Sequence, residues 1–150
     1  MAALAPIEGT ARADDGARRP ILLVVAANSP VNNLSLDDVK RIFGGGAIDF
    51  RPLNLPPGAA ERVDLDRILF SRTPDEVARY WLDRKIRGQG GPPRVIPSGH
   101  LVARIVARVP GTIGYVAETA LPAGTKALRV NGLSPADPRY PLVMQPRPSP

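Results

Sequence analysis

An uninterrupted apolar run at residues 21–27, Ile-Leu-Leu-Val-Val-Ala-Ala, constrains the fold more than any other part of the chain. A strand with one face in water alternates apolar and polar side chains, whereas this run has no polar position. Such a strand must be covered on both faces, as strands in the middle of α/β sheets are. We therefore predict that residues 21–27 form a central strand with other elements packed on both of its faces.

Helix signals follow this strand. Ser35 can cap a helix, with Asp38 three residues later, and apolar side chains recur at helical spacing until a Gly-Gly-Gly run at residues 44–46 ends the pattern. Thr73 is a second cap, with Pro74 at the first helical position and Glu76 three residues after the cap. This alternation of strands and helices predicts an α/β fold, a mixed β-sheet flanked by helices. Further helices are expected within 63–70 and 98–109, and further strands at 51–55, 94–97, 113–117 and 127–130.

Composition divides the 150 residues into three segments. Residues 1–20 are rich in Ala, Asp, Gly and Arg without an apolar period, which predicts a disordered leader or the remnant of a signal peptide. Residues 21–133 carry the strand and helix signals and are expected to form a single α/β domain. Residues 134–150 contain six prolines, which predicts an extended Pro-rich tail.

The leader holds the one pattern that resembles a targeting signal. Ala11 and Ala13 have the A-x-A spacing of a signal-peptidase site, but the apolar region before them is too short for a complete export signal. Two interpretations stay open, a signal peptide that is truncated in this chain and an alanine-rich disordered leader. The first interpretation predicts a periplasmic or secreted protein.

The excess of basic residues indicates which kinds of binding partner to expect. The chain has 20 Lys and Arg residues against 14 Asp and Glu, a formal net charge of +6, and most of the basic residues are arginines. Arginine suits phosphate and carboxylate partners, although scattered arginines also simply solvate a surface. No block of about five to eight basic residues occurs, and aromatic residues are few, so no nucleic-acid partner is expected.

Residue types for catalysis and metal binding are sparse. The chain has no cysteine, which excludes disulfides, thiol nucleophiles and cysteine-ligated metals. The single histidine, His100, has no second histidine or cysteine with which to share a metal, and no Gly-x-Ser-x-Gly motif is present. We therefore predict a protein that is not an enzyme and that uses no cofactor, metal ion or catalytic residue.

A set of spaced motifs carries a resemblance to a known family. The motifs are Asn28-Ser29-Pro30-Val31, residues 34–44, Tyr80-Trp81, residues 88–93, residues 101–109, Pro110-Gly111-Thr112-Ile113-Gly114-Tyr115 and Tyr140-Pro141-Leu142. Each motif is short, but their order and spacing together are specific. Through them the sequence from residue 21 to residue 142 resembles the phosphate-type substrate-binding proteins of ABC importers, which implies a single lobe of the periplasmic binding protein type.

The chain departs from this family where the ligand should be held. Family members that bind phosphate present a Ser-Gly-Thr motif at a helix start, where hydroxyl groups and backbone N–H groups converge on the anion. This chain has Pro-Pro-Gly-Ala-Ala at residues 56–60 instead. Both hydroxyl donors are therefore missing, and the negative charge of Glu61 opposes an anion there, with Arg62 partly offsetting it. The expected ligand-binding residues are Gly58, Ala59, Ala60, Arg62, Ser98 and Gly99.

Two possible functions follow from the resemblance to this family and from the absence of its Ser-Gly-Thr motif. The first is a non-catalytic, single-lobe binding module that takes phosphate or another small oxyanion and works with a membrane transporter or a periplasmic protein. The alternative is a protein-interaction module that kept the lobe fold and lost its ligand. Because a single lobe cannot close over a solute, a homodimer that rebuilds two lobes is a further expectation.

Overall fold

The central sheet is mixed. The computed structural model describes residues 18–46, 49–117 and 121–146. Within these residues the strand order is β5-β4-β6-β2-β7. β2 runs antiparallel to β6 and β7, whereas β4 runs parallel to β5 and β6, so the predicted mixed α/β sheet is confirmed. The strands are β2 (Leu22–Ala26), β4 (Arg51–Asn54), β5 (Arg94–Val95), β6 (Thr112–Val116) and β7 (Thr125–Ala127).

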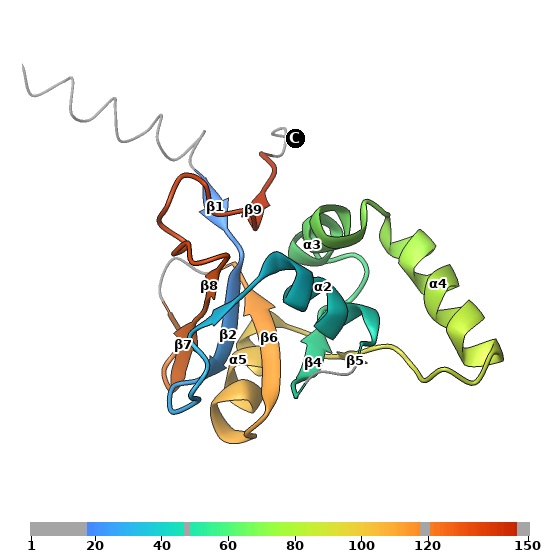
Figure 1. Cartoon of the computed structure of the whole chain (residues 1–150), viewed down its shortest axis with the longest axis horizontal. Coiled ribbons are helices and arrows are strands. Elements are labelled where there is room, and N and C mark those ends of the chain that lie inside the picture. Colours follow the sequence, from blue (N-terminus) through green and yellow to red (C-terminus); the bar gives the residue numbers. More distant parts are fainter. Residues whose placement is uncertain (1–17, 47–48, 118–120, 147–150) are drawn as a thin grey trace, which may run out of the picture.

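The apolar run forms the core strand that its composition predicts. Ile21, Leu23, Val24 and Val25 are 0% exposed. Figure 1 shows α2 (Leu36–Gly44) in front of the sheet and α5 (Gly99–Arg108) behind it. Because side chains of a strand alternate between the two faces, a strand with helices on both sides buries every position.

α2 begins and ends at the predicted residues. The Ser35 hydroxyl oxygen accepts a hydrogen bond from the Asp38 N–H at 3.0 Å. Ile42 and Phe43 face the core, and Gly45 ends the helix at a φ of 95°, a conformation that glycine adopts without steric cost. The helix therefore covers the sheet with its apolar side, as the spacing predicts.

α3 (Ala60–Phe70) and α4 (Pro74–Ile86) form a helical pair beside the sheet. α3 starts before the predicted residue 63. α4 starts with the complete capping box, in which Thr73 and Glu76 exchange side chain-to-backbone hydrogen bonds at 2.9 and 3.2 Å. Figure 1 shows α4 at the periphery, beside α3 and away from the sheet. Its Leu82 and Ile86 side chains are 59% and 76% exposed.

α5 and β6 approach each other closely. Ser98 caps α5 by accepting a hydrogen bond from the Leu101 N–H at 3.2 Å. Gly114 of β6 lies directly under the helix, and a Cβ at this position would lie 2.3 Å from Cγ1 of Val102. Such a distance is incompatible with normal packing, so the glycine is what allows α5 to lie this close to the sheet.

The C-terminal segment corrects the predicted domain boundary at residue 133. β9 (Val143–Met144) pairs antiparallel with β1 (Arg19–Pro20), and Tyr140 donates a hydrogen bond to the Ile21 carbonyl at 2.7 Å. Tyr140, Leu142 and Met144 belong to the hydrophobic core. The ordered unit therefore includes residues assigned to the leader, which join it through the β1–β9 pairing, and residues assigned to the tail, whose side chains complete the core. Predictions for residues 1–17 and 147–150 lie outside the described residues.

A second short pairing involves the predicted strand at residues 127–130. The structure divides it into β7 and β8 (Arg129–Val130), and β8 pairs in parallel with β3 (Asn33–Leu34). Leu128, which lies between the two strands, is fully buried. The chain bends here because its two halves pair with different partners.

Candidate functional site

The predicted ligand-binding segments meet at one edge of the sheet. β4 and β5 are parallel neighbours in the register Asn54↔Val95, so the segments that follow them leave the sheet on the same side. α3 follows β4, and α5 follows β5. In open α/β sheets, ligands bind beyond the carboxyl ends of the strands. Gly58, Ala59 and Ala60 therefore lie at the same edge as Ser98 and Gly99, although about 40 residues separate the two groups in the sequence.

The start of α3 provides backbone rather than side-chain donors. Ala59 is the N-cap residue and makes no side-chain capping bond, and its own N–H donates to the Pro56 carbonyl at 2.9 Å. Gly58 is exposed, with no atom within 4 Å of a Cβ placed on it. Glu61 occupies the first turn, where its charge opposes an anion. An oxyanion at this end would depend on the helix dipole and on backbone N–H groups beyond Ala60.

Arg62 does not lie at the surface of this edge, where it was expected to offset Glu61. Its side chain points inward and the residue is 6% exposed. Nε donates to Asp66 Oδ2 at 3.0 Å, and Nη1 donates to the Leu55 carbonyl at 2.9 Å. The spacing of four residues places Asp66 one helical turn from Arg62, which is the sequence signal that could have indicated this pairing. Arg62 therefore supports the loop before α3 from inside.

Other buried polar groups also hold the backbone between β4 and α3. The Tyr115 hydroxyl hydrogen-bonds to the Asn54 side-chain oxygen, and the Leu55 N–H donates to the Tyr115 oxygen at 3.2 Å. Burial raises the pKa of Tyr115 well above its ordinary value. Burial also raises the pKa of Asp66, and the charge of Arg62 opposes that rise. The network fixes the backbone between β4 and α3, so the loop is held in one conformation.

Asp64 has a structural role that the sequence interpretation missed. Asp64 is 1% exposed and accepts a hydrogen bond from the Gln145 N–H at 3.2 Å. Its Oδ1 also lies 3.7 Å from Nη2 of Arg67. The aspartate thus ties α3 to the C-terminal segment, a contact between residues that are distant in the sequence.

The start of α5 offers a second set of donors. The Ser98 oxygen already accepts the Leu101 N–H, which leaves the hydroxyl hydrogen as a donor. Gly99 is half-buried, and a Cβ on it would lie 3.4 Å from Cγ1 of Val116. His100 is exposed. The structure thus brings five of the six predicted ligand-binding residues to one edge of the sheet at positions outside the core, and Arg62 alone is turned inward.

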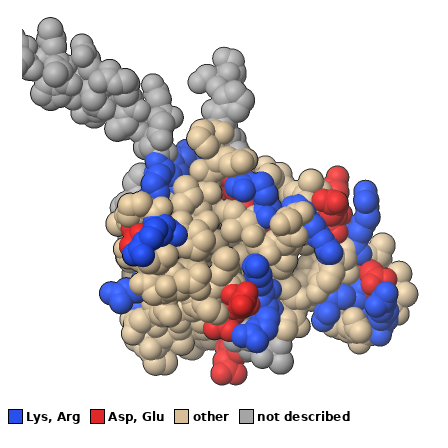
Figure 2. All heavy atoms as spheres, turned by 45° about the horizontal axis from the view of Figure 1, so that its top comes forward, with Lys and Arg blue, Asp and Glu red and all other residues tan. Residues whose placement is uncertain are grey.

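The surface charge is dispersed. On the face shown in Figure 2, Lys and Arg side chains are interspersed with acidic and uncharged groups. Among the described residues, no three His, Cys, Asp or Glu side chains are grouped so that they could hold a metal ion. In the same residues, no helix has the length and apolar character that a membrane crossing requires.

Three solved structures are similar to this chain along most of its length. One, from Clostridium perfringens, is described as a phosphate ABC transporter substrate-binding protein with bound phosphate; its TM-score is 0.69 at 17% identity, over 87% of this chain and 54% of that one. The second is an ABC-type phosphate transport receptor from Vibrio cholerae, with a TM-score of 0.66, 14% identity and coverages of 85% and 54%. The third is PstS from Borrelia burgdorferi, with a TM-score of 0.65, 16% identity and coverages of 85% and 55%.

These similarities confirm the predicted fold. The chain has the mixed α/β architecture of a lobe of phosphate-type substrate-binding proteins, and it spans just over half of the length of the solved proteins. No protein-family model and no curated relative matches the sequence.

Proposed function

We propose that this protein is a non-catalytic binding module that takes phosphate or a similar small oxyanion where α3 and α5 begin. The observation that carries the proposal is that β4 and β5 are parallel neighbours, so the helices that follow them start at one edge of the sheet. Helix N-termini carry partial positive charge, which suits an oxyanion. The fold is that of proteins whose descriptions name phosphate, and one of them holds it.

The proposed partners follow from the same similarity. Two of the similar structures are named as components of ABC-type transport. We therefore include in the proposal a membrane transporter or a periplasmic protein as partner, and a periplasmic or secreted location. Self-association into a homodimer is the arrangement that would place a second lobe opposite the edge.

Calorimetric titration with phosphate, sulfate and molybdate tests the proposed site. Saturable binding of one oxyanion at both low and moderate salt is the expected result, because a formed site is screened less than diffuse arginine attraction. Glu61→Gln should tighten that binding about two- to fivefold, since it removes a negative charge from the first turn of α3. The matched control is Asp75→Asn, which makes the same charge change at the start of α4 and should leave the affinity unchanged.

The alternative function, a protein-interaction module, is favoured by a different observation. Leu82 and Ile86 project from α4 with 59% and 76% of their surface exposed, and they lie one helical turn apart. Apolar side chains grouped in this way are typical of interaction surfaces. An absence of heat with all three oxyanions would contradict the proposed binding function and favour this alternative.

A further inference from the structure

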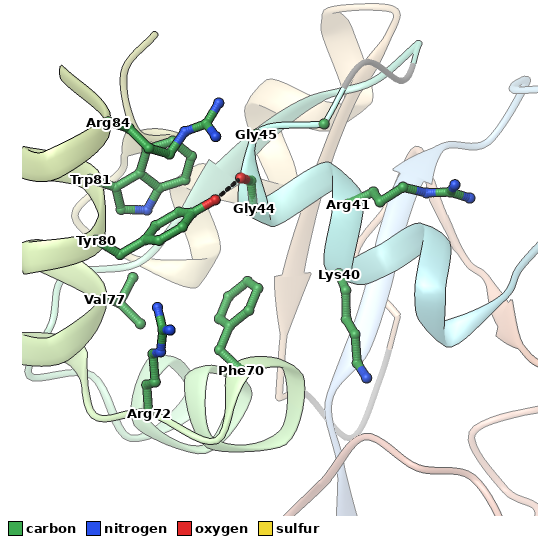
Figure 3. A pocket seen from close by; sticks show the side chains of 11 residues that line it. Lys40, Arg41, Gly44, Gly45, Phe70, Arg72, Val77, Tyr80, Trp81 and Arg84 are labelled. Carbon is green, nitrogen blue, oxygen red and sulfur yellow. Dashed lines mark hydrogen bonds between the residues drawn. The ribbon is translucent and has the colours of Figure 1, made fainter. Parts of the chain in front are cut away.

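A hollow of about 480 Å³ lies between the C-terminal half of α2, the last residue of α3 and α4 (Figure 3). It is at the opposite end of α3 from the proposed oxyanion site, which is at the start of that helix. Its volume is in the range of small-molecule sites, roughly 300–1000 Å³. We propose that this hollow is a second binding site, for a small aromatic carboxylate, and that it is independent of the proposed oxyanion site.

Aromatic side chains give the hollow rigid apolar walls. Phe70, Tyr80 and Trp81 line it. The rings of Tyr80 and Trp81 meet edge to face, with centroids 5.2 Å apart, and Tyr80 donates a hydrogen bond to the Gly44 carbonyl at 2.9 Å. A Cβ on Gly45 would lie only 2.9 Å from Trp81, so the glycine allows the end of α2 to close against the indole. Fixed aromatic walls of this kind suit a flat ring.

The charged side chains around these walls are cationic. Lys40, Arg41, Arg72 and Arg84 line the hollow, and none of the described lining residues is acidic. Arg41 is paired with Asp38. The guanidinium carbon of Arg72 lies 5.5 Å from the Tyr80 ring centroid, beside the apolar wall. A ligand that combines an aromatic ring with a negative charge matches both features.

Glu76, an acidic residue in the first turn of α4, is already engaged. The hydrogen bond from the Thr73 N–H lowers the pKa of Glu76, and the charge of Arg72 adds to this effect. The Glu76 carboxylate accepts that hydrogen bond at 2.9 Å in the capping box and is absent from the lining of the hollow. It therefore does not occupy the place of a bound carboxylate.

Arg84 lies against the aromatic wall of the hollow. Its Nη2 donates to the Gln89 carbonyl at 2.9 Å, and its guanidinium carbon lies 5.5 Å from the Trp81 ring. Its Nε–H is buried and has no hydrogen-bond partner in the part of the chain that the structure describes. The Arg84 guanidinium also adds a positive charge to the lining of the hollow, which favours an anionic ligand there.

Nuclear magnetic resonance tests this site directly because Trp81 is the single tryptophan of the chain. The probes are 2-naphthoate, an aromatic carboxylate, and 2-naphthamide, a neutral compound of the same shape. We expect 2-naphthoate to shift the Trp81 indole N–H resonance saturably, with a Kd at least about tenfold lower than that of the amide. Absence of a saturable shift would overturn the proposal, and so would equal affinity for the two compounds.

Charge reversal locates the site. Arg72→Glu and Lys40→Glu should each weaken 2-naphthoate binding by about tenfold. The matched control is Arg104→Glu, the same charge change at an exposed residue of α5 outside the hollow, and it should leave the affinity unchanged. The dispersion of the amide resonances confirms that each variant is folded. If Arg104→Glu lost as much affinity for 2-naphthoate, the effect would come from the net charge of the protein and not from the hollow. That result would overturn the proposed site.

Inorganic phosphate separates this inference from the proposed function. We expect phosphate to leave the Trp81 resonance in place whether or not calorimetry detects phosphate binding to the protein. A saturable phosphate shift of that resonance, competitive with 2-naphthoate, would contradict the assignment of the hollow to an aromatic ligand. Failure of phosphate, sulfate and molybdate to bind anywhere would overturn the oxyanion site and leave the aromatic site standing.

Discussion

Two buried tyrosine hydroxyls secure distant parts of the chain. Tyr115 on β6 hydrogen-bonds to Asn54 at the end of β4. Tyr140 donates to the Ile21 carbonyl at 2.7 Å and so holds the C-terminal segment against the central strand. Burial raises the pKa of both tyrosines well above the ordinary value. Both hydroxyls therefore keep their protons in the folded protein at a pH at which an unfolded chain loses them.

This difference predicts a loss of stability at alkaline pH. In the unfolded chain tyrosine ionises near pH 10, so above that pH the unfolded state binds fewer protons than the folded state. The free energy of unfolding should fall as pH rises, by at most about 1.4 kcal/mol per pH unit for each tyrosine. Tyr115→Phe should reduce this slope in urea unfolding between about pH 10 and 11.5. Identical slopes for the variant and the unmodified protein would contradict the prediction.

At the scale of elements, α4 and α5 have similar caps and very different surroundings. α5 lies on the sheet, with Val102 and Val106 fully buried. α4 packs beside α3 at the periphery (Figure 1). A helix that is built into the core unfolds with the whole domain, whereas a peripheral helix opens by itself at lower cost.

Removal of the two caps should therefore have different consequences. Ser98→Ala and Thr73→Ala each remove a capping hydroxyl, a loss of about 1 kcal/mol. Ser98→Ala should lower the free energy of global unfolding by that amount. Thr73→Ala should instead speed hydrogen exchange within α4 and leave the global unfolding midpoint nearly unchanged. A global loss of equal size in both variants would show that α4 unfolds together with the core.

The elements also show which parts of this structure are predictable from the sequence. The caps at Ser35 and Thr73 were predicted correctly because capping depends on residues within one helical turn. The β1–β9 and β3–β8 pairings were missed because two-residue strands carry no periodicity. The candidate site divides in the same way. The start of α5 was predicted, whereas α3 begins at Ala60, before the predicted residue 63. The inward position of Arg62 depends on its hydrogen bonds to Leu55 and Asp66.

For the whole molecule, the C-terminal segment shows how composition can mislead. The prolines after residue 133 predicted an extended tail, and β9 is indeed extended. Tyr140, Leu142 and Met144, however, are 2%, 0% and 5% exposed. Their spacing of two residues is typical of a strand with one buried face, a signal that the many prolines of this segment obscure. The described parts of both ends of the chain thus meet in β1 and β9, which closes the fold.

A truncated chain tests whether residues 134–146 are essential for folding. A chain ending after residue 133 loses three large core side chains, each of which contributes about 1.5–3 kcal/mol by burial. That sum, roughly 5–9 kcal/mol, is comparable to the entire stability of a typical domain of about 5–15 kcal/mol. We expect this chain to show no cooperative thermal unfolding by circular dichroism, whereas a chain ending after residue 146 should unfold like the intact protein. Cooperative unfolding of the shorter chain would restore the boundary at residue 133 and would mean that residues 134–146 merely cover a core that is complete without them.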